Sequence, residues 1–219
     1  MRFPLADLEE QLADFAAAFP DAVGDAAGRS FVRKPVGGLE HAGAPRLVLP
    51  ASVEQPRPSE SIADFRARVV LVPLRHVVVL LQYGAMAMGY WDGASLVRHK
   101  AEKRYVVRGN GTAQVTHLRT KGKSRYGSRL RLQNWQLLLA DVNERLVAWW
   151  GELPEPELVF LAMNPRAAAA LWQSDPPPPF ARDDGRIRRV PRHVHVPDHE
   201  ELLAVERFLS SGELLLPER

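Results

Sequence analysis

The spacing of hydrophobic residues predicts three amphipathic helices. Apolar residues recur every three or four positions over residues 5–19, just before Pro20, which is the pattern of a helix and of its end. The same spacing predicts a long helix over residues 128–150, with Ser128 as its N-cap, and a last helix over residues 198–209. Each helix has one apolar face, so we expect a sheet or another helix to cover it.

Short runs of Val, Leu and alternating apolar residues predict a sheet in the middle of the chain. The run that begins at Arg68 is interrupted at Pro73, and a hairpin turn is expected at Asp92-Gly93. An alanine-rich helix over residues 165–173 separates the later strands. The alternation of strands and helices predicts an α/β fold with a mixed sheet flanked by helices. The expected strands cover residues 68–72, 76–82, 83–91, 94–99, 104–108, 157–163 and 187–190.

The first part of the chain differs from the rest in composition. Residues 24–61 are rich in Gly, Pro and Ala and hold only short apolar pieces, which predicts irregular structure or short edge strands. We therefore divide the chain into an N-terminal extension, residues 1–65, and a main domain, residues 66–219. The helix of the extension is expected to dock on another surface through its apolar face.

Charge is distributed very unevenly along the chain. Eleven Lys or Arg residues and a single acidic residue, Glu102, stand between Arg98 and Arg131, a net charge of +10, whereas the whole chain carries +3. The remainder is therefore acidic, with a net charge of −7. Such a concentration of positive charge indicates a surface that binds the phosphates of a nucleic acid. The predicted RNA-binding residues are Lys100, Lys103, Arg104, Arg108, Arg119, Lys121, Lys123, Arg125, Arg129 and Arg131.

The basic stretch contains a segment that we expect to be a mobile loop. Residues 109–127 include four glycines, several cations and no apolar periodicity, so they bury too little surface to order themselves. Within them, Gly111, Thr112, Ala113 and Gln114 form a Gly-x-x-Gln string. The amide of Gln114 is a neutral donor and acceptor that can orient water or hold an oxyanion. Taken alone, such a string is more often a turn with a solvent-facing glutamine.

Several short motifs follow one another around this string. They are His99-Lys100, the run Lys-Arg-Tyr-Val-Val-Arg over residues 103–108, the string itself, Gly127-Ser128, Leu130-Arg131 and Asn134. In this order they resemble the VLRF family, release-factor-like proteins of ribosome quality control that are related to the eukaryotic ankyrin-repeat and zinc-finger peptidyl-tRNA hydrolase. Because the chain has no cysteine, it resembles a bacterial member that lacks the zinc finger.

The resemblance implies a fold like that of the central catalytic domain of class I eukaryotic and archaeal release factors. It places the active residue of the family at Gln114, although the tripeptide Thr112-Ala113-Gln114 departs from the Gly-Gly-Gln of those factors. It further implies the large ribosomal subunit, peptidyl-tRNA and rRNA as partners and the cytoplasm as the location. No soluble cofactor is implied, and neither a membrane nor DNA is expected as a partner.

Two reactions stay open for the expected release of a peptide. Either water attacks the ester between peptide and terminal ribose, with Gln114 placing the water, or a neighbouring 2′-hydroxyl cuts the tRNA backbone near its 3′ end. Gln has no useful pKa, so it positions or stabilises but does not act as a general base. In a backbone cut, His117 or His99 would move protons and Arg108 would stabilise the charge of the phosphate.

Two other classes of function compete with this interpretation. A non-catalytic RNA-binding or ribosome-associated protein would use the same basic loop only for docking, and a general ribonuclease would turn over free RNA. A metal site at His193, His195 and His199 is disfavoured, since no acidic or cysteine partner stands near them in a recognisable pattern. A second cationic cluster is interpreted as a solvated strand edge; it comprises Arg186, Arg188, Arg189 and Arg192.

Overall fold

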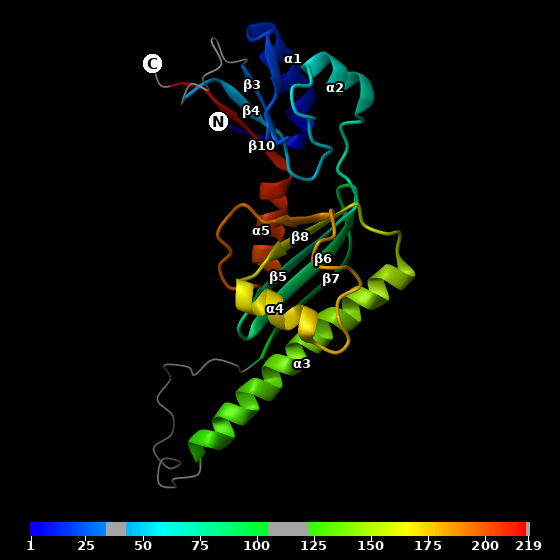
Figure 1. Cartoon of the computed structure of the whole chain (residues 1–219), viewed down its shortest axis with the longest axis vertical. Coiled ribbons are helices and arrows are strands. Elements are labelled where there is room, and N and C mark those ends of the chain that lie inside the picture. Colours follow the sequence, from blue (N-terminus) through cyan, green and yellow to red (C-terminus); the bar gives the residue numbers. More distant parts are fainter. Residues whose placement is uncertain (34–42, 105–122, 218–219) are drawn as a thin grey trace. The chain divides into compact units, whose positions relative to one another are not determined.

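The computed structural model describes residues 1–33, 43–104 and 123–217, with only the helical backbone for residues 123–128. The chain forms two compact units, each built on its own five-stranded sheet (Figure 1). The division predicted at residue 65 stays a prediction. By their contacts, the first unit comprises Met1–Leu74, Asp92–Ala94 and Ala204–Arg219, and the second comprises Arg75–Trp91 and Ser95–Leu203.

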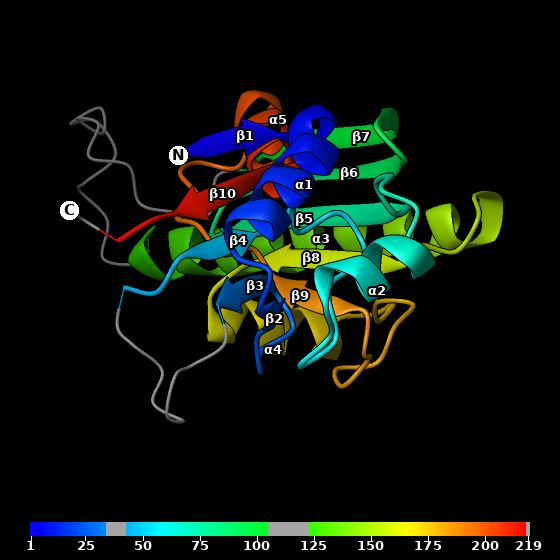
Figure 2. The same ribbon diagram turned by 90° about the horizontal axis from the view of Figure 1, so that it is seen from above.

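The sheet of the first unit brings the two ends of the described chain together. Its strand order is β1-β10-β4-β3-β2, and all four pairs of neighbours are antiparallel. In Figure 2 the strand β10 lies between β1 and β4, although it follows β4 by more than one hundred and sixty residues. The elements of this unit are β1 (Arg2–Pro4), η1 (Leu5–Asp7), α1 (Leu8–Ala18), β2 (Ala22–Gly24), β3 (Ser30–Arg33), β4 (Arg46–Val48), α2 (Ile62–Arg68) and β10 (Ser211–Leu215).

A separate hydrophobic core stabilises this first unit. The helix α1 buries Leu8, Leu12 and Phe15, as its spacing predicted, and these side chains share one core with Phe31 of β3. The ring of Phe65 in α2 packs edge-on against Phe31, with 5.3 Å between the ring centroids. Residues 24–61 do form short strands, but β3 and β4 lie inside the sheet rather than at its edge.

The strand predicted over residues 68–72 is wrong. Arg68 is the last residue of α2, and residues 69–72 belong to neither a helix nor a strand. The hydroxyl of Ser61 accepts a hydrogen bond from the backbone N–H of Asp64 at 3.1 Å and caps the helix. This cap explains why Arg68 belongs to a helix, and within the run itself the backbone N–H of Val72 bonds to the carbonyl of Val70 at 2.8 Å, a local turn rather than a strand pair.

The second unit contains a mixed sheet, as the sequence predicted. Its strand order is β7-β6-β5-β8-β9; β5 pairs with β6 in antiparallel and with β8 in parallel orientation, and β8 pairs in parallel with β9. The predicted bounds of the strand over 76–82 and the helix over 165–173 are confirmed. The elements are β5 (His76–Gln82), β6 (Ala85–Asp92), β7 (Ser95–Lys103), α3 (Lys123–Glu152), β8 (Leu158–Ala162), α4 (Pro165–Gln173), β9 (Ile187–Arg189) and the start of α5 (His199–Leu209). By its contacts, α5 belongs to the first unit from Ala204 onward.

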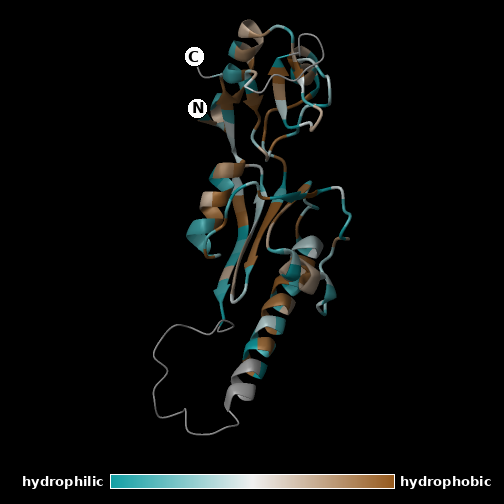
Figure 3. Cartoon of the chain, turned by 60° about the vertical axis from the view of Figure 1, so that its left-hand side comes forward, coloured by the Kyte–Doolittle hydropathy of each residue, from teal (hydrophilic) through white to brown (hydrophobic). Residues whose placement is uncertain are grey.

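Helices cover both faces of this sheet. Alternate residues of β5, namely Val77, Val79 and Leu81, share a core with the buried side chains of α3 and α4. On the opposite face, the position where a Cβ of Gly89 would stand lies 2.5 Å from the ring of Trp91 and 3.3 Å from Leu202 of α5. The central strands are accordingly hydrophobic along their length (Figure 3), which is typical of a strand that is buried on both sides.

The helix α3 begins earlier than the sequence predicted. Its first residue is Lys123, so Ser128 lies inside the helix and does not cap it. The glycine at position 127 costs about 1 kcal/mol in a helix, which the remaining turns offset. Trp135, Leu139 and Val142 are buried as expected, whereas Leu132 is 58% exposed. The beginning of α3 extends past the strands of the second sheet (Figure 1).

The contact between β1 and β10 provides a test of the first unit. Phe3 is paired with Gly212, and a Cβ at position 212 would stand 2.1 Å from the ring of Phe3. We expect Gly212→Ala to lower the free energy of unfolding by about 1–3 kcal/mol, since the buried ring has to move. The matched control is Gly151→Ala in α3, where nothing lies within 4 Å of the new Cβ and a gain of up to about 1 kcal/mol is expected. Denaturation in urea measures both, and equal stability of Gly212→Ala and wild type would contradict the packing.

Candidate nucleic-acid interface

Only part of the predicted site lies within the described residues. Gly111, Thr112, Ala113 and Gln114 lie outside them, and so do His117 and the cations Arg108, Arg119 and Lys121. Lys123 and Arg125 lie in α3, where the backbone alone is described. The predicted residues whose side chains are described are Lys100, Lys103, Arg104, Arg129 and Arg131.

The basic side chains of β7 and of Arg104, which follows it, lie on two opposite faces of the sheet. Successive side chains of a strand point in opposite directions, so even and odd positions separate. The even positions Lys100 and Arg104 contact acidic groups on the side of α3, whereas the odd position Lys103 contacts Asp198, next to α5. Lys103 therefore lies on the opposite face of the sheet from Lys100 and Arg104.

On the α3 side, Arg104 joins the end of β7 to the long helix. Its guanidinium donates to the carboxylate of Glu102 at 2.6 Å and also pairs with Asp141 of α3. The hydrogen bond from Arg104 holds the pKa of the Glu102 carboxyl below its usual range, and Lys100 adds an ion pair at 3.6 Å. Two carboxylates thus share this guanidinium, which gives Arg104 a structural role; a role in RNA binding stays a prediction.

On the other face, β7 contacts the start of α5. Lys103 Nζ lies 3.2 Å from a carboxylate oxygen of Asp198, and the other oxygen of Asp198 accepts the backbone N–H of Glu201. This backbone hydrogen bond is the largest cause of a lowered pKa of Asp198, and the hydrogen bond from Lys103 is the next largest. The bond to Glu201 also confirms Asp198 as the predicted cap of α5. The rings of His99 and His199 lie 4.4 Å apart between centroids. His99 stands five residues before Arg104, a distance of roughly 16 Å along the strand.

Two predicted cations stand on α3 before it reaches the sheet. Arg129 is exposed and Arg131 is partly buried. Arg131 precedes Trp135 by one helical turn, so both lie on the same side of α3. Sequence reasoning missed a neighbour of this region, Tyr83, because a single aromatic residue in a two-residue turn has no periodic pattern. Its ring stacks on Trp135, with 4.5 Å between centroids.

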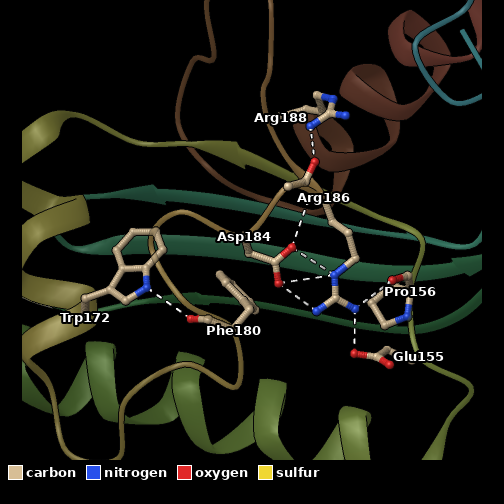
Figure 4. Close-up of polar contacts among 8 residues, drawn as sticks. Glu155, Pro156, Trp172, Phe180, Asp184, Arg186 and Arg188 are labelled. Atoms are coloured by element: carbon tan, nitrogen blue, oxygen red, sulfur yellow. Dashed lines mark hydrogen bonds and ion pairs between the residues drawn. The ribbon is translucent and has the colours of Figure 1, made fainter.

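The second cationic cluster has a largely structural centre, as Figure 4 shows. Arg186 donates to both carboxylate oxygens of Asp184, to Glu155 and to the carbonyl of Pro156. The hydrogen bond to Asp184 is the main cause of a raised pKa of Arg186 and of a lowered pKa of Asp184. These contacts hold the segment before β9 against the start of β8. Arg188 and Arg189 of β9 are exposed, in agreement with a solvated strand edge.

Neither a metal cluster nor a membrane span is found in the part of the chain that the structure describes. No group of three His, Asp or Glu side chains there is placed to hold a metal ion. The rings of His193 and His195 lie 5.2 Å apart between centroids without such a third partner among the described residues. Among the described helices, none is both long and apolar enough to cross a membrane.

A mixed sheet with helices on both faces, together with a second sheet that has its own core, defines an α/β protein with a release-factor-like fold. Residues 76–215 match the model of the family described as Bacteroidetes VLRF1 release factor. The match covers more than half of the chain, and the chain belongs to this family. The resemblance seen in the motifs around Gln114 is thereby confirmed at the level of the family.

Curated relatives and a solved structure agree with this assignment. The protein named tRNA endonuclease ANKZF1 of Mus musculus is 32% identical over 143 residues, which are 64% of this chain and 19% of that protein. Its Homo sapiens counterpart is 31% identical over 138 residues, 62% of this chain and 19% of that protein. The chain therefore spans about a fifth of the length of these relatives. A structure of the Vms1 mitochondrial localization core has a TM-score of 0.53 at 13% identity, over 98% of this chain and 82% of that one, which shows a shared fold.

The link between Arg104, Glu102 and Asp141 predicts how stability depends on pH. We expect Arg104→Met to lower the free energy of unfolding by about 1–2 kcal/mol near neutral pH, because two partly buried carboxylates lose their partner. A lowered pKa in the folded state means that Glu102 stabilises the fold above its ordinary value of 4.5 and that this contribution is lost as the pH falls. The difference between wild type and variant should therefore shrink at about pH 3.

The measurement is denaturation in urea at both pH values. The matched control is Arg98→Met, since Arg98 is an exposed cation on the same face of β7 and its guanidinium donates to the carbonyl of Val97 at 3.4 Å. Its effect should stay within about 0.5 kcal/mol. A constant difference between wild type and Arg104→Met across this pH range would contradict the assigned role of Glu102.

Proposed function

We propose that this chain is a release factor that cleaves peptidyl-tRNA on the large ribosomal subunit and frees stalled nascent chains in the cytoplasm. The observation that carries the proposal is the family match over residues 76–215, which includes the mixed sheet, α3 and the whole basic stretch. In this proposal Gln114 is the active residue, and Gly111, Thr112 and Ala113 form the loop that presents it. This cleavage is a step of ribosome rescue and quality control.

The described residues on either side of the segment that carries Gln114 support its delivery to RNA. One flank, Arg104, is fixed at the sheet by its backbone N–H to the carbonyl of Gly84 at 2.8 Å and by its ion pair with Asp141. The other flank is the start of α3 at Lys123, eighteen residues before Asp141. At 1.5 Å per residue, this part of the helix measures about 27 Å. A rigid helix of that length supports delivery of the segment that carries Gln114 into a narrow RNA site.

The relatives favour one of the two reactions. They are named tRNA endonuclease, which supports a cut in the tRNA backbone: the 2′-oxygen bonds to phosphorus, the bond to the 5′-oxygen breaks, and the 2′-proton passes to a base while the 5′-oxygen gains one. Gln114 would hold the phosphate or the hydroxyl in place, since an amide does not accept that proton. We assign no proton transfer to His99, because it contacts His199 and stands roughly 16 Å from Arg104.

A docking protein without activity is the second candidate. The pairing of Lys100, Lys103 and Arg104 with acidic side chains shows that several cations of the stretch already have structural partners. A protein that uses the remaining cations only to bind rRNA would tolerate the loss of one neutral side chain. The two candidates therefore differ in how they respond to a change at Gln114.

Peptide release from large subunits that carry stalled peptidyl-tRNA tests the proposed activity. We expect Gln114→Ala to slow release by about 10²–10³-fold, the usual loss when one positioned donor is removed from a reaction centre. Asn110→Ala is the matched control, because it removes another neutral amide from the same stretch, and its rate should stay close to that of wild type. The 3′ end of the released tRNA is sequenced in parallel.

The outcomes separate the reactions. A shortened tRNA 3′ end supports a backbone cut, and an intact end supports hydrolysis of the ester. No release by the wild type, or equal release by wild type and Gln114→Ala, would favour the docking protein. Turnover of free RNA at a similar rate would instead point to a general ribonuclease.

Binding to large subunits should depend steeply on salt, since each neutralised phosphate releases counterions. We expect Arg129→Ala, on α3, to reduce the slope of log affinity against log salt by about 0.7–1, the contribution of one phosphate contact. Arg188→Ala is the matched control: it removes an exposed arginine from β9, at the opposite edge of the sheet from β7. A filter-binding titration at several salt concentrations measures both. An equal change for the two variants would contradict the assignment of the interface to the side of β7 and α3.

A further inference from the structure

We propose that Tyr83 is a stacking platform for an unpaired nucleobase of the bound RNA. The inference rests on the proposed function in one respect, namely that the natural ligand is RNA. It assigns a binding residue outside the segment that carries Gln114 and outside the basic stretch, and it is built only from described side chains.

The turn between β5 and β6 presents Tyr83 at the end of the sheet. Gln82 pairs with Ala85, so the turn consists of Tyr83 and Gly84 alone. Gly84 has a φ of +87°, which glycine adopts readily and other residues rarely do. The side chain of Gln82 donates to the carbonyls of Val194 and His195 on one face. Since neighbouring side chains point to opposite faces, Tyr83 projects to the α3 side.

One face of the Tyr83 ring is covered by Trp135, and the residue as a whole is half exposed. The ring stacks on Trp135 at an interplanar angle of 14°, with 4.5 Å between centroids. Trp135 is only 5% exposed and belongs to the core between α3 and the sheet, so it holds Tyr83 in a fixed orientation. Tyr83 nevertheless remains 51% exposed. With one ring face stacked on Trp135, about half of Tyr83 stays accessible to a ligand.

The surroundings favour a nucleic acid over an apolar partner. The carbonyl of Gly84 accepts the backbone N–H of Arg104, so the turn lies beside the end of β7. Arg131 stands one helical turn before Trp135 on the same side of α3, and Arg129 is exposed in the same helix. Proteins bind single-stranded RNA through aromatic rings that stack on bases together with cations that contact the phosphates. Tyr83 provides the ring of this combination, and Arg131 provides a cation on the same side of α3 as Trp135.

The test measures the affinity of the full chain for a short, unstructured, fluorescein-labelled oligoribonucleotide. Two forms are compared: the intact RNA, and a set in which one nucleotide at a time is replaced by an abasic ribose. Tyr83→Leu keeps an apolar contact with Trp135 but has no π face, so we expect intact RNA to bind about tenfold more weakly, in the range of one base–aromatic stack. Tyr83→Phe should bind as wild type does, and Tyr83→Trp at least as tightly.

The abasic set identifies the interaction. At one position, the abasic replacement should weaken binding by wild type about as much as Tyr83→Leu weakens binding of intact RNA. Tyr83→Leu should then bind that abasic RNA no more weakly than it binds intact RNA, since both changes remove the same stack. Val147→Ala, which changes another exposed residue of α3, is the matched control and should leave both affinities unchanged. Thermal melting of each variant establishes that the fold is intact.

Three results would overturn the inference. The first is equal binding of intact RNA by wild type and Tyr83→Leu. The second is that Tyr83→Leu loses as much affinity for abasic RNA as for intact RNA. The third is that Tyr83→Leu binds ribosomal subunits more weakly but binds the oligonucleotide as wild type does, which would assign the surface to a protein partner. The proposed activity is judged separately. If the wild type releases no peptide but binds intact RNA better than abasic RNA in a way that depends on Tyr83, the stacking role stands and the proposed activity fails. If the wild type releases peptide but Tyr83→Leu binds RNA as wild type does, the activity stands and the stacking role fails.

Discussion

The burial of β5 on both of its faces is the constraint on which the second unit depends. Residues 76–81 are all fully buried; the odd positions pack against α3 and α4, while the even side packs His76 against the rings of Trp91 and Phe160. Each buried Val or Leu contributes roughly 1.5–3 kcal/mol relative to an exposed one. The strand is stable only if helices cover both faces, so α3 and α5 are required by the composition of a single strand.

The same strand sets the position of the surface that we assign to RNA. Its pairing with β6 runs without a bulge from His76 to Gln82, and this register puts the turn with Tyr83 beside Arg104 at the end of β7. The ion pair of Arg104 with Asp141 then joins that end to α3. Packing of the core thus determines where the segment with Gln114 leaves the sheet and where it enters the helix.

The charge of the basic stretch has a different meaning in the fold than in the sequence. Lys100, Lys103 and Arg104 contact Glu102, Asp198 and Asp141, so part of the excess of +10 is neutralised by acidic side chains, two of which stand far away in the chain. Arg98 and Arg129 are exposed. A count of cations along the chain therefore overestimates the positive charge available to a phosphate backbone, and the alternation of β7 decides on which face each cation acts.

The sequence alone determined the features that depend on neighbouring residues: the apolar run of β5, the spacing of α1 and α4, the cap at Asp198, the α/β class, and the ordered motifs around Gln114 that place the chain in its family. Tertiary structure decided what depends on distant residues. The strand β10 exists because β1 and β4 pair with it, and Tyr83 becomes a supported ring because the ring of Trp135 stacks on it. Periodicity records which face of an element is apolar, whereas pairing and exposure follow from partners that are adjacent only in the folded chain.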